Sequence, residues 1–196
     1  MKVTVFYDYN CPYCYLGSMS LNELSKEFEM DIEWKGFEIH PEFPQEGRKR
    51  SKSMKSIKVS RGVKEMALQD GFQIKLPGFA ANSRLGLEGS EFAKTKGLFK
   101  EFHEGVYEAY FKKGLNIGDI NTLLEIGSYI GLDKAELEEA LRSRSLYQKI
   151  EDNRKEAQNN RILGVPTYIF GKFPVHGYQP TETFRKIIQR AIERSQ

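Results

Sequence analysis

The chain has 196 residues and a formal net charge of +3, with 39% hydrophobic and 29% charged residues. These fractions are typical of a soluble globular protein, and the length suits one domain with a substantial core. No segment approaches the roughly 20 apolar residues that span a bilayer, and the small net charge does not favour nucleic acid, so we expect neither partner. The first residues lack the apolar stretch of a secretory signal, which predicts a cytoplasmic protein.

The first forty residues alternate between strand and helix patterns. Residues 2–7, KVTVFY, form a nearly continuous apolar run that is typical of a strand buried on both faces. Leu21, Leu24 and Phe28 follow at helical spacing with charged residues between them, which predicts an amphipathic helix. Residues 31–40 have the pattern of a second strand. This part of the chain therefore predicts a β-α-β unit.

A basic run follows at residues 48–61, RKRSKSMKSIKVSR, with seven basic residues and no acidic one. Such a run can bind nucleic acid or serve as a localisation signal. Charge runs more often form a solvated surface. We interpret this one as an exposed loop that leads into a helix.

Helical patterns fill the chain from about residue 57 to residue 160. The first apolar stripe comprises Phe99, Phe102, Val106 and Tyr110, and the second comprises Ile120, Leu123, Leu124 and Gly127. Asp133, with Glu136 three residues later, has the pattern of a capping box at the start of a further helix. We expect an all-helical block here.

The end of the chain adds two strands and a helix. Residues 167–170 and 173–176 are strand-like runs joined by a two-residue loop that starts with glycine, as in a tight hairpin, and Pro174 places the second run at a sheet edge. A final helical stripe comprises Phe184, Ile187, Ile188, Ala191 and Ile192. The chain therefore predicts an α/β fold in which a β-α-β half and a β-β-α half are separated by a large all-helical insertion.

The only two cysteines, Cys11 and Cys14, stand just after the first predicted strand in the sequence CPYC. We expect Asn10 to cap the helix that begins here, and Pro12 is tolerated in the first turn because an N–H at that position would have no partner within the helix. Residues three apart lie on the same face of a helix, so the two sulfurs can meet. The pair can therefore form a reversible disulfide.

The helix N-terminus predicts different reactivities for the two thiols. Unpaired N–H groups and the helix dipole favour an anion at Cys11, so we expect the pKa of its thiol in the range of about 3.5–7 and not near 8.5. Cys14, one turn further in, should keep a higher pKa and attack the mixed disulfide that Cys11 forms with a substrate.

Three other interpretations of the cysteine pair have less support. A zinc site needs two more ligands, and His40, His103 and His176 occur singly without ligand spacing, so we expect no metal. A structural disulfide is rare in a reducing compartment, and a loop this short constrains little of the unfolded chain. Two inert buried cysteines would fit an isolated motif, but the strand before and the helix after them give the context of a thioredoxin-like redox motif.

Segments spread over nearly the whole chain carry a family resemblance. They are DYNCPYCYLG at 8–17, FAANSRLGLEGSEFAK at 79–94, EAYFKKGLNIGD at 108–119, and ILGVPTYIF at 162–170 with GYQP after it. With these segments the chain resembles the DsbA family of the thioredoxin superfamily, and in particular its cytoplasmic FrnE-like branch, kin to 2-hydroxychromene-2-carboxylate isomerases and kappa-class glutathione transferases. The resemblance implies a thioredoxin fold.

The resemblance also implies a division of the chain and roles for individual residues. Residues 1–44 and 161–196 would form the thioredoxin-like domain, and residues 45–160 the inserted helical subdomain. Cys11 would be the nucleophile and Cys14 the resolving thiol. The Val165–Pro166 bond would be cis and face the cysteines, with Pro166 packed against the disulfide and the Val165 backbone paired with an extended substrate.

Further substrate contacts follow from the same resemblance. Pro12 and Tyr13, between the cysteines, are expected to touch the substrate. Asn82 matches an asparagine-containing segment of the isomerase and transferase relatives, so we expect it to bind substrate. The match leaves glutathione open as a co-substrate, and we expect no bound cofactor. Those relatives commonly carry a serine or another residue in place of the nucleophilic cysteine, so two cysteines favour thiol–disulfide exchange.

One position departs from the wider superfamily. Many thioredoxin-like proteins bury an acid in the first strand, six residues before the nucleophile, and here that position is Val5. Proton transfer at the cysteines would then depend on Asp8, Glu38 or water.

Three functions remain open, in order of support. The first is a thiol–disulfide oxidoreductase or disulfide isomerase whose partners are protein or small-molecule thiols and disulfides, and a reducing cytoplasm favours reduction or isomerisation. The alternative is a glutathione-dependent isomerase or transferase. The third is a chaperone-like protein that holds clients on the aromatic helical block, although such stripes are more often core. That block includes Phe99, Phe102, Tyr107, Tyr110 and Phe111. No oligomeric state is predicted.

Overall fold

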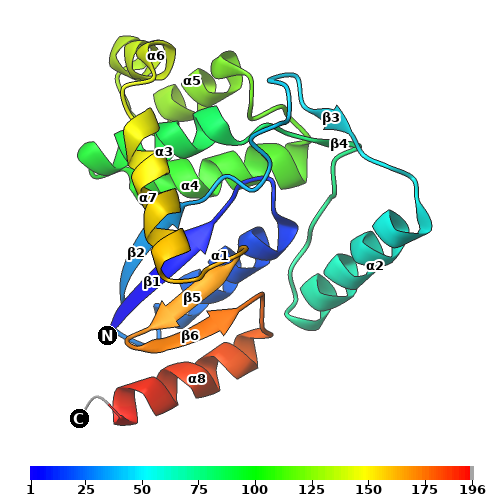
Figure 1. The fold of residues 1–196 in the computed structure, drawn as a ribbon, viewed down its shortest axis with the longest axis vertical. Coiled ribbons are helices and arrows are strands. Elements are labelled where there is room, and N and C mark those ends of the chain that lie inside the picture. Colours follow the sequence, from blue (N-terminus) through cyan, green and yellow to red (C-terminus); the bar gives the residue numbers. More distant parts are fainter. Residues whose placement is uncertain (195–196) are drawn as a thin grey trace.

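The computed structural model describes residues 1–194, and the side chains of Met54 and Lys55, which belong to the basic run, lie outside this description. The main sheet has the strand order β2-β1-β5-β6. Its strands are β1 Lys2–Tyr7, β2 Asp31–Gly36, β5 Thr167–Phe170 and β6 Phe173–His176. β1 runs parallel to β2 and antiparallel to β5, so the two ends of the chain meet in the middle of the sheet (Figure 1).

Helices occupy most of the chain between β2 and β5. The helices are α1 Pro12–Leu24, α2 Met54–Gln69, α3 Arg84–Thr95, α4 Phe99–Glu108, α5 Ile120–Tyr129, α6 Lys134–Ser143, α7 Tyr147–Asn159 and α8 Thr181–Glu193, and a π-helical segment, Ala109–Lys113, directly follows α4. A separate ribbon pairs β3 Arg48–Lys49 with β4 Phe79–Ala80. No helix within residues 1–194 has the length and apolar character needed to cross a membrane.

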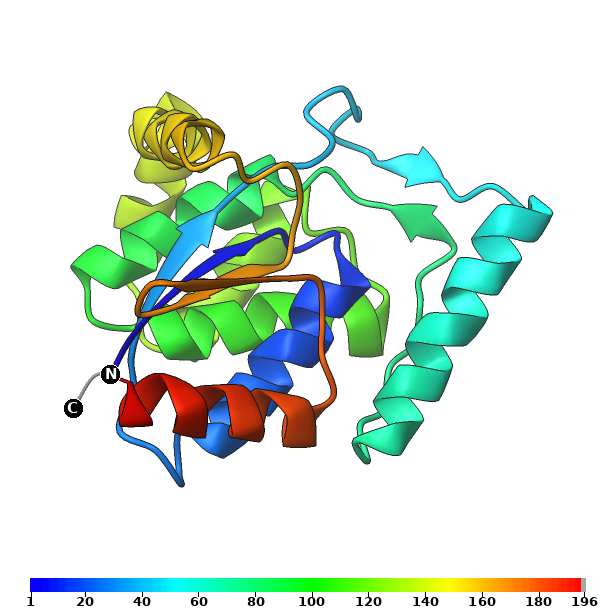
Figure 2. The same cartoon turned by 60° about the horizontal axis from the view of Figure 1, so that its bottom comes forward.

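β1 is buried on both faces, as its apolar run predicts. Val3, Val5 and Tyr7 lie in a large core that also contains buried side chains of α1, α8 and the helices between β2 and β5. Phe6, on the opposite face, packs with Ala157 of α7. Figure 2 shows α1 and α8 on one side of the sheet and α7 on the other. This arrangement of the two halves is the expected thioredoxin fold.

The predicted second strand is shorter than its sequence pattern. β2 ends at Gly36 and not at residue 40, because β1 ends at Tyr7, opposite Gly36, and offers no further strand to pair with. The chain then follows the loop after β1. There the Ile39 N–H donates to the Asp8 carboxylate at 2.7 Å.

The hairpin and the last helices follow the sequence closely. β5 and β6 have the predicted bounds, and Pro174 lies in the outer strand β6. Asp133 caps α6, where its carboxylate accepts the Glu136 N–H at 2.8 Å. The apolar stripe of α8 is buried at Phe184, Ile188 and Ala191.

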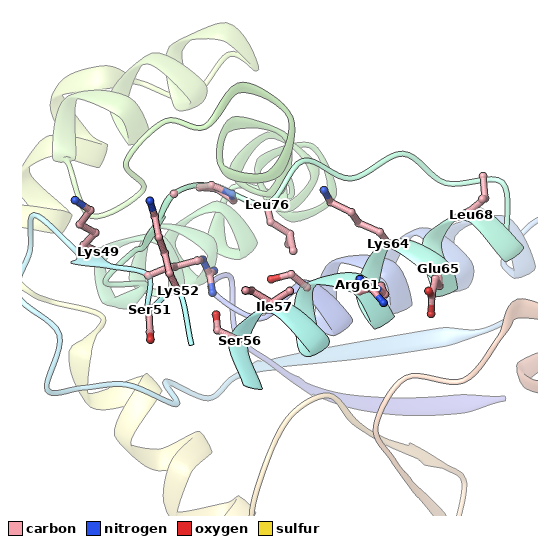
Figure 3. Close-up of a pocket in the computed structure, with 14 residues that line it drawn as sticks. Lys49, Ser51, Lys52, Ser56, Ile57, Arg61, Lys64, Glu65, Leu68 and Leu76 are labelled. Atoms are coloured by element: carbon pink, nitrogen blue, oxygen red, sulfur yellow. The ribbon is translucent and has the colours of Figure 1, made fainter. Parts of the chain in front are cut away.

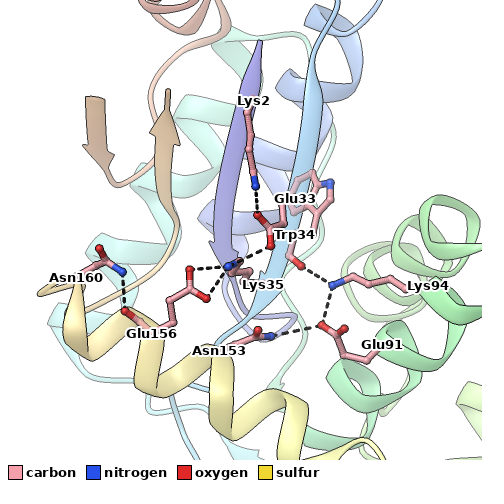
Figure 4. Close-up of polar contacts among 9 residues, drawn as sticks. All are labelled: Lys2, Glu33, Trp34, Lys35, Glu91, Lys94, Asn153, Glu156 and Asn160. Atoms are coloured by element: carbon pink, nitrogen blue, oxygen red, sulfur yellow. Dashed lines mark hydrogen bonds and ion pairs between the residues drawn. The ribbon is translucent and has the colours of Figure 1, made fainter. Parts of the chain in front are cut away.

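Charged side chains cover the outer edge of β2. Lys35 donates to both carboxylate oxygens of Glu156 on α7 at 2.5 and 2.6 Å, and Lys94 on α3 donates to the Trp34 carbonyl at 2.5 Å (Figure 4). Lysines along an edge strand hinder pairing with another chain. β2 is therefore protected by side chains of the helices beside it.

Residues 50–78 leave the body of the fold and carry α2 (Figures 1 and 2). The β3–β4 ribbon closes the base of this excursion. Val63 and Ala67 bury one face of α2, which packs against α1. Beyond the helix, Asp70 accepts hydrogen bonds from the Tyr178 hydroxyl and, at 3.1 Å, from the Thr181 N–H. These attachments fix α2 beside α1.

Candidate active site

Cys11 is the N-cap of α1, and Pro12 occupies the first helical turn. The sequence pattern predicts Asn10 as the cap, but the helix begins one residue later, because the Cys11 carbonyl accepts the N–H groups of Cys14 and Tyr15 at 3.1 and 3.3 Å. Asn10 instead lies against Tyr110, whose hydroxyl oxygen is 3.0 Å from Asn10 Oδ1.

The cysteines face the loop that leads into β5. Cys11 and Cys14 are both buried, at 6% and 2% exposure. The Val165–Pro166 peptide bond is cis, as predicted. The Cys11 thiol donates to the Val165 carbonyl with an Sγ to O distance of 3.7 Å. The fold therefore brings the CPYC and GVPT segments together from opposite ends of the chain.

The environment of Cys14 favours its neutral thiol. Burial raises the pKa of Cys14 well above its ordinary value, and the hydrogen bond and charge of Cys11 act in the same direction. The charge of Asp8 also raises this pKa, while the Asp8 backbone N–H lowers it. Cys14 thus holds its proton firmly, which suits a resolving thiol.

Asp8 and Glu38, the two acids considered for proton transfer, differ in position. Asp8 is fully buried, and its carboxylate oxygens accept the N–H groups of Asn10 and Ile39, each at 2.7 Å. Burial raises the pKa of Asp8, and these N–H groups oppose that shift. Glu38 pairs with Arg84 at 2.9 Å. The charge of Asp8 contributes to the raised pKa of Cys14.

A cavity of about 440 Å³ opens beside Cys11. Cys11 and Pro12 form one wall, and His40 and Phe43 form another. The remaining wall carries consecutive cations at residues 48–50, the start of the basic run. In the sequence, only the high density of positive charge marks residues 48–50 as possible site residues.

The loop interpretation of the basic run is wrong for its first residues. Residues 48–49 form β3, because they pair with Phe79–Ala80, and this pairing places the cations at the cavity. The helix expected after the loop is present as α2.

The other predicted contact residues have different surroundings. Tyr13 is partly buried between Cys11 and α2, and burial and the charge of Cys11 raise the pKa of its hydroxyl. Asn82 lies outside the cavity lining, where its amide donates to the Phe43 carbonyl at 2.7 Å and accepts the Arg84 N–H at 3.0 Å. Asn82 thus supports the cavity wall through Phe43, and its contact with a substrate stays a prediction.

Tyr110 is a site residue that the sequence pattern assigned to an apolar helical stripe and to the aromatic block. Its hydroxyl oxygen lies 2.8 Å from the Phe79 carbonyl and 3.1 Å from the Arg50 guanidinium, in addition to its contact with Asn10. Tyr110 lies in the π-helical segment after α4, and such segments recur at functional sites. One buried hydroxyl therefore links the loop before Cys11 to β4 and to Arg50.

The aromatic block is largely core. Its most buried members, each at most 1% exposed, are Phe102, Tyr107, Tyr110 and Phe111. These rings are therefore not available to hold a client protein.

The model of the DSBA-like thioredoxin domain family matches residues 2–189. The chain belongs to this family. The uncharacterized protein YwbO of Bacillus subtilis is 29% identical over 192 residues, which cover 96% of each chain. This DsbA-like chain is therefore related over nearly its whole length to a protein of similar size.

Solved structures share the fold at low sequence identity. A protein described as a probable DsbA oxidoreductase from Streptomyces coelicolor has a TM-score of 0.84 at 19% identity, covering 98% of this chain and 90% of its own. A 2-hydroxychromene-2-carboxylate isomerase has a TM-score of 0.81 at 18% identity, covering 100% and 98%. The cytosolic disulfide reductase DsbM of Pseudomonas aeruginosa with glutathione has a TM-score of 0.76 at 16% identity, covering 98% and 100%. These neighbours agree with the DsbA-like branch that the sequence resembles.

Proposed function

We propose that this DsbA-like protein is a thiol–disulfide oxidoreductase or disulfide isomerase with Cys11 as nucleophile and Cys14 as resolving thiol. The observation that carries the proposal is the position of the Cys11 sulfur, at the N-terminus of α1 and 3.7 Å from the Val165 carbonyl. Cys14 follows one turn later on the same helix. This arrangement supports a reversible exchange between the two thiols.

The exchange proceeds in two balanced steps. The Cys11 thiolate attacks one sulfur of a substrate disulfide, a bond forms between Cys11 and that sulfur, and the other substrate sulfur leaves as a thiolate. Cys14 then loses its proton and attacks the Cys11 sulfur, which releases the second substrate thiolate. The substrate gains two electrons, and the protein is left with a Cys11–Cys14 disulfide. Two equivalents of a cellular thiol then return the pair to the dithiol form and are themselves joined in a disulfide.

Residues around the pair hold the substrate in this proposal. The Val165 backbone pairs with an extended substrate segment, and Pro166 packs against the cysteines. Pro12 and Tyr13 form the adjoining surface. We propose the cytoplasm as the compartment and reduction or isomerisation as the direction, since a glutathione pool keeps most such dithiols reduced.

Serine variants of the two cysteines test this function. In an assay that follows thiol-driven reduction of the insulin disulfides, Cys11→Ser should reduce the rate to that of the thiol alone, because serine cannot form the mixed disulfide. Cys14→Ser should still attack and should accumulate the mixed disulfide, which mass spectrometry detects. Reductase activity retained by the folded Cys11→Ser protein would refute the proposal.

A glutathione-dependent isomerase or transferase is the second candidate. It is favoured by the full-length similarity to the 2-hydroxychromene-2-carboxylate isomerase. In that case Cys11 or Tyr13 only positions the glutathione thiolate. The Cys11→Ser protein would then keep glutathione-dependent turnover while lacking insulin reduction, which separates the two candidates.

A further inference from the structure

A second cavity, of about 740 Å³, lies between residues 56–68 of α2 and residues 76–78, and we name it the α2 groove. It shares Lys49, Arg50, Ser51 and Ser56 with the cavity beside Cys11. The two cavities therefore adjoin. A ligand whose sulfur reaches Cys11 can extend into the α2 groove.

Cations dominate the lining of the α2 groove. They are Lys49, Arg50, Lys52, Arg61 and Lys64, and Glu65 is the one acidic residue in the lining. Among the side chains that the structure describes, none of these six forms an ion pair. The groove thus concentrates unpaired positive charge beside the proposed active site.

Apolar side chains lie between these cations. Ile57 and Leu68 of α2 are 46% and 79% exposed, and Leu76 lies across the groove from α2 (Figure 3). Large apolar side chains on an accessible concave surface mark interaction sites. The ligand should therefore combine negative charge with apolar groups.

The length of the groove fits a polypeptide. The lining of α2 extends from Ser56 to Leu68, which corresponds to about 18 Å at 1.5 Å per residue. An extended chain covers that length with roughly five or six residues at about 3.3 Å each. A compact small molecule would leave much of the groove empty.

We propose that the α2 groove binds an acidic, partly apolar polypeptide segment that flanks the reactive cysteine of a protein substrate. The proposal rests on the thiol–disulfide function proposed above and names its substrate class. Carboxylates of the segment pair with the cations, and its apolar side chains contact Ile57, Leu68 and Leu76. The segment is then held while its cysteine reacts with Cys11.

Two charge-matched variants test the groove. The groove variant carries Lys52→Glu, Arg61→Glu and Lys64→Glu, all at exposed positions in the lining. The control variant carries Lys26→Glu, Lys134→Glu and Lys172→Glu, which are exposed and lie outside the groove. Both variants change the net charge equally, so only position differs.

The binding assay uses labelled eight-residue peptides in which serine replaces the reactive cysteine. One peptide has Asp and Glu beside Leu, and the other has Asn and Gln at the same positions. Fluorescence anisotropy should show that the unmodified protein and the control variant bind the acidic peptide about tenfold more tightly than the neutral one or better, with the preference lost in the groove variant. Equal binding of the two peptides, or equal loss in both variants, would overturn the proposal. Tighter binding of a single-stranded oligonucleotide of the same charge would also overturn it.

A kinetic assay keeps the two proposals apart. The same peptides, now with cysteine linked to a chromogenic aromatic thiol, release that thiol when Cys11 attacks. The groove variant should react with the acidic peptide about tenfold more slowly and with the neutral peptide at an unchanged rate. If neither peptide reacts with any protein, the thiol–disulfide function fails, while the anisotropy result still decides the groove.

Discussion

Cys14 lies one helical turn beyond Cys11 and is shielded from solvent by the core of the fold. Burial is the largest cause of its raised pKa, followed by the hydrogen bond and the charge of Cys11. Both contributions of Cys11 disappear once its sulfur is joined to a substrate. Burial, the largest cause, remains, so the pKa of Cys14 in the mixed disulfide should still exceed the ordinary value of about 8.5.

The raised pKa of Cys14 predicts the pH dependence of the resolving step. The attack needs the Cys14 thiolate, so the rate of resolution should rise with pH from pH 6 and level off only above about pH 8.5. The measurement uses a preformed mixed disulfide at Cys11 and acid quenching at each pH. A plateau below pH 8 would contradict the effect of burial.

Asp8→Asn separates two roles for the buried carboxylate. If Asp8 acts through its negative charge, the variant should move the resolution profile to lower pH, because that charge raises the pKa of Cys14. If Asp8 accepts the Cys14 proton, the rate should fall at every pH. Circular dichroism checks that the loop stays folded, since asparagine offers one acceptor oxygen in place of the two that bind Asn10 and Ile39.

At the scale of elements, α1 and β5 meet without a side chain between them at Gly17. A Cβ atom at Gly17 would overlap the Tyr168 hydroxyl oxygen and lie 2.9 Å from the ring carbon Cζ. That hydroxyl is buried and has no hydrogen-bond partner within residues 1–194. The close approach of helix and strand therefore depends on glycine at this position.

We expect Gly17→Ala to lower the free energy of unfolding by about 1–3 kcal/mol through overpacking, although alanine is the better helix former. Gly62→Ala in α2 is the matched control, because its Cβ would meet only the Tyr13 hydroxyl at 3.9 Å. The control should be neutral or stabilising by up to about 1 kcal/mol. Urea denaturation measures both changes, and equal effects would refute the steric explanation.

Tyr168→Phe provides the second half of this test. Removing an unsatisfied buried hydroxyl should be neutral or stabilising by itself. In the Gly17→Ala background it should restore part of the lost stability, since the hydroxyl oxygen is gone but Cζ remains. If the effects of the two substitutions on the free energy of unfolding simply add, the two residues do not interact.

Most of these elements could be predicted from local patterns. The apolar run at residues 2–7, the hairpin before residue 177 and the cap at Asp133 depend on neighbouring residues, so sequence spacing identifies them. The end of β2 depends on where its partner β1 ends, and the cap at Cys11 depends on the exact path of the loop after β1. Such boundaries are set by tertiary contacts and cannot be read from spacing.

At the scale of the whole molecule, the active site combines segments that are distant in sequence. From the sequence, only the family resemblance predicts that the CPYC and GVPT segments lie next to each other. The cations at residues 48–50 reach the same cavity because the β3–β4 ribbon turns them toward it. A charge run carries no information about that ribbon, so their position beside Cys11 could not be predicted.

His103 shows how the helices and the sheet are joined in one core. The ring is buried, with Nδ1 3.1 Å from the Tyr9 hydroxyl and Nε2 3.1 Å from the Ser18 hydroxyl. Rings of Tyr7, Trp34 and other aromatic residues surround it. Burial, assisted by the positive charge of Lys94, lowers the pKa of His103 to about 3. The folded protein therefore holds a neutral histidine where the unfolded chain would take up a proton.

This histidine should make the fold sensitive to mild acid. Because the folded pKa lies below the unfolded value of about 6.5, the unfolded state binds more protons below pH 6.5, and stability is lost as the pH falls from there toward 3. The expected loss from His103 at pH 5 is about 2 kcal/mol. Urea denaturation at pH 7.5 and pH 5 measures it, with His103→Gln as the control that retains hydrogen-bonding groups but cannot titrate. The variant should lose less stability than the unmodified protein between the two pH values, and equal losses would show that another group causes the acid sensitivity.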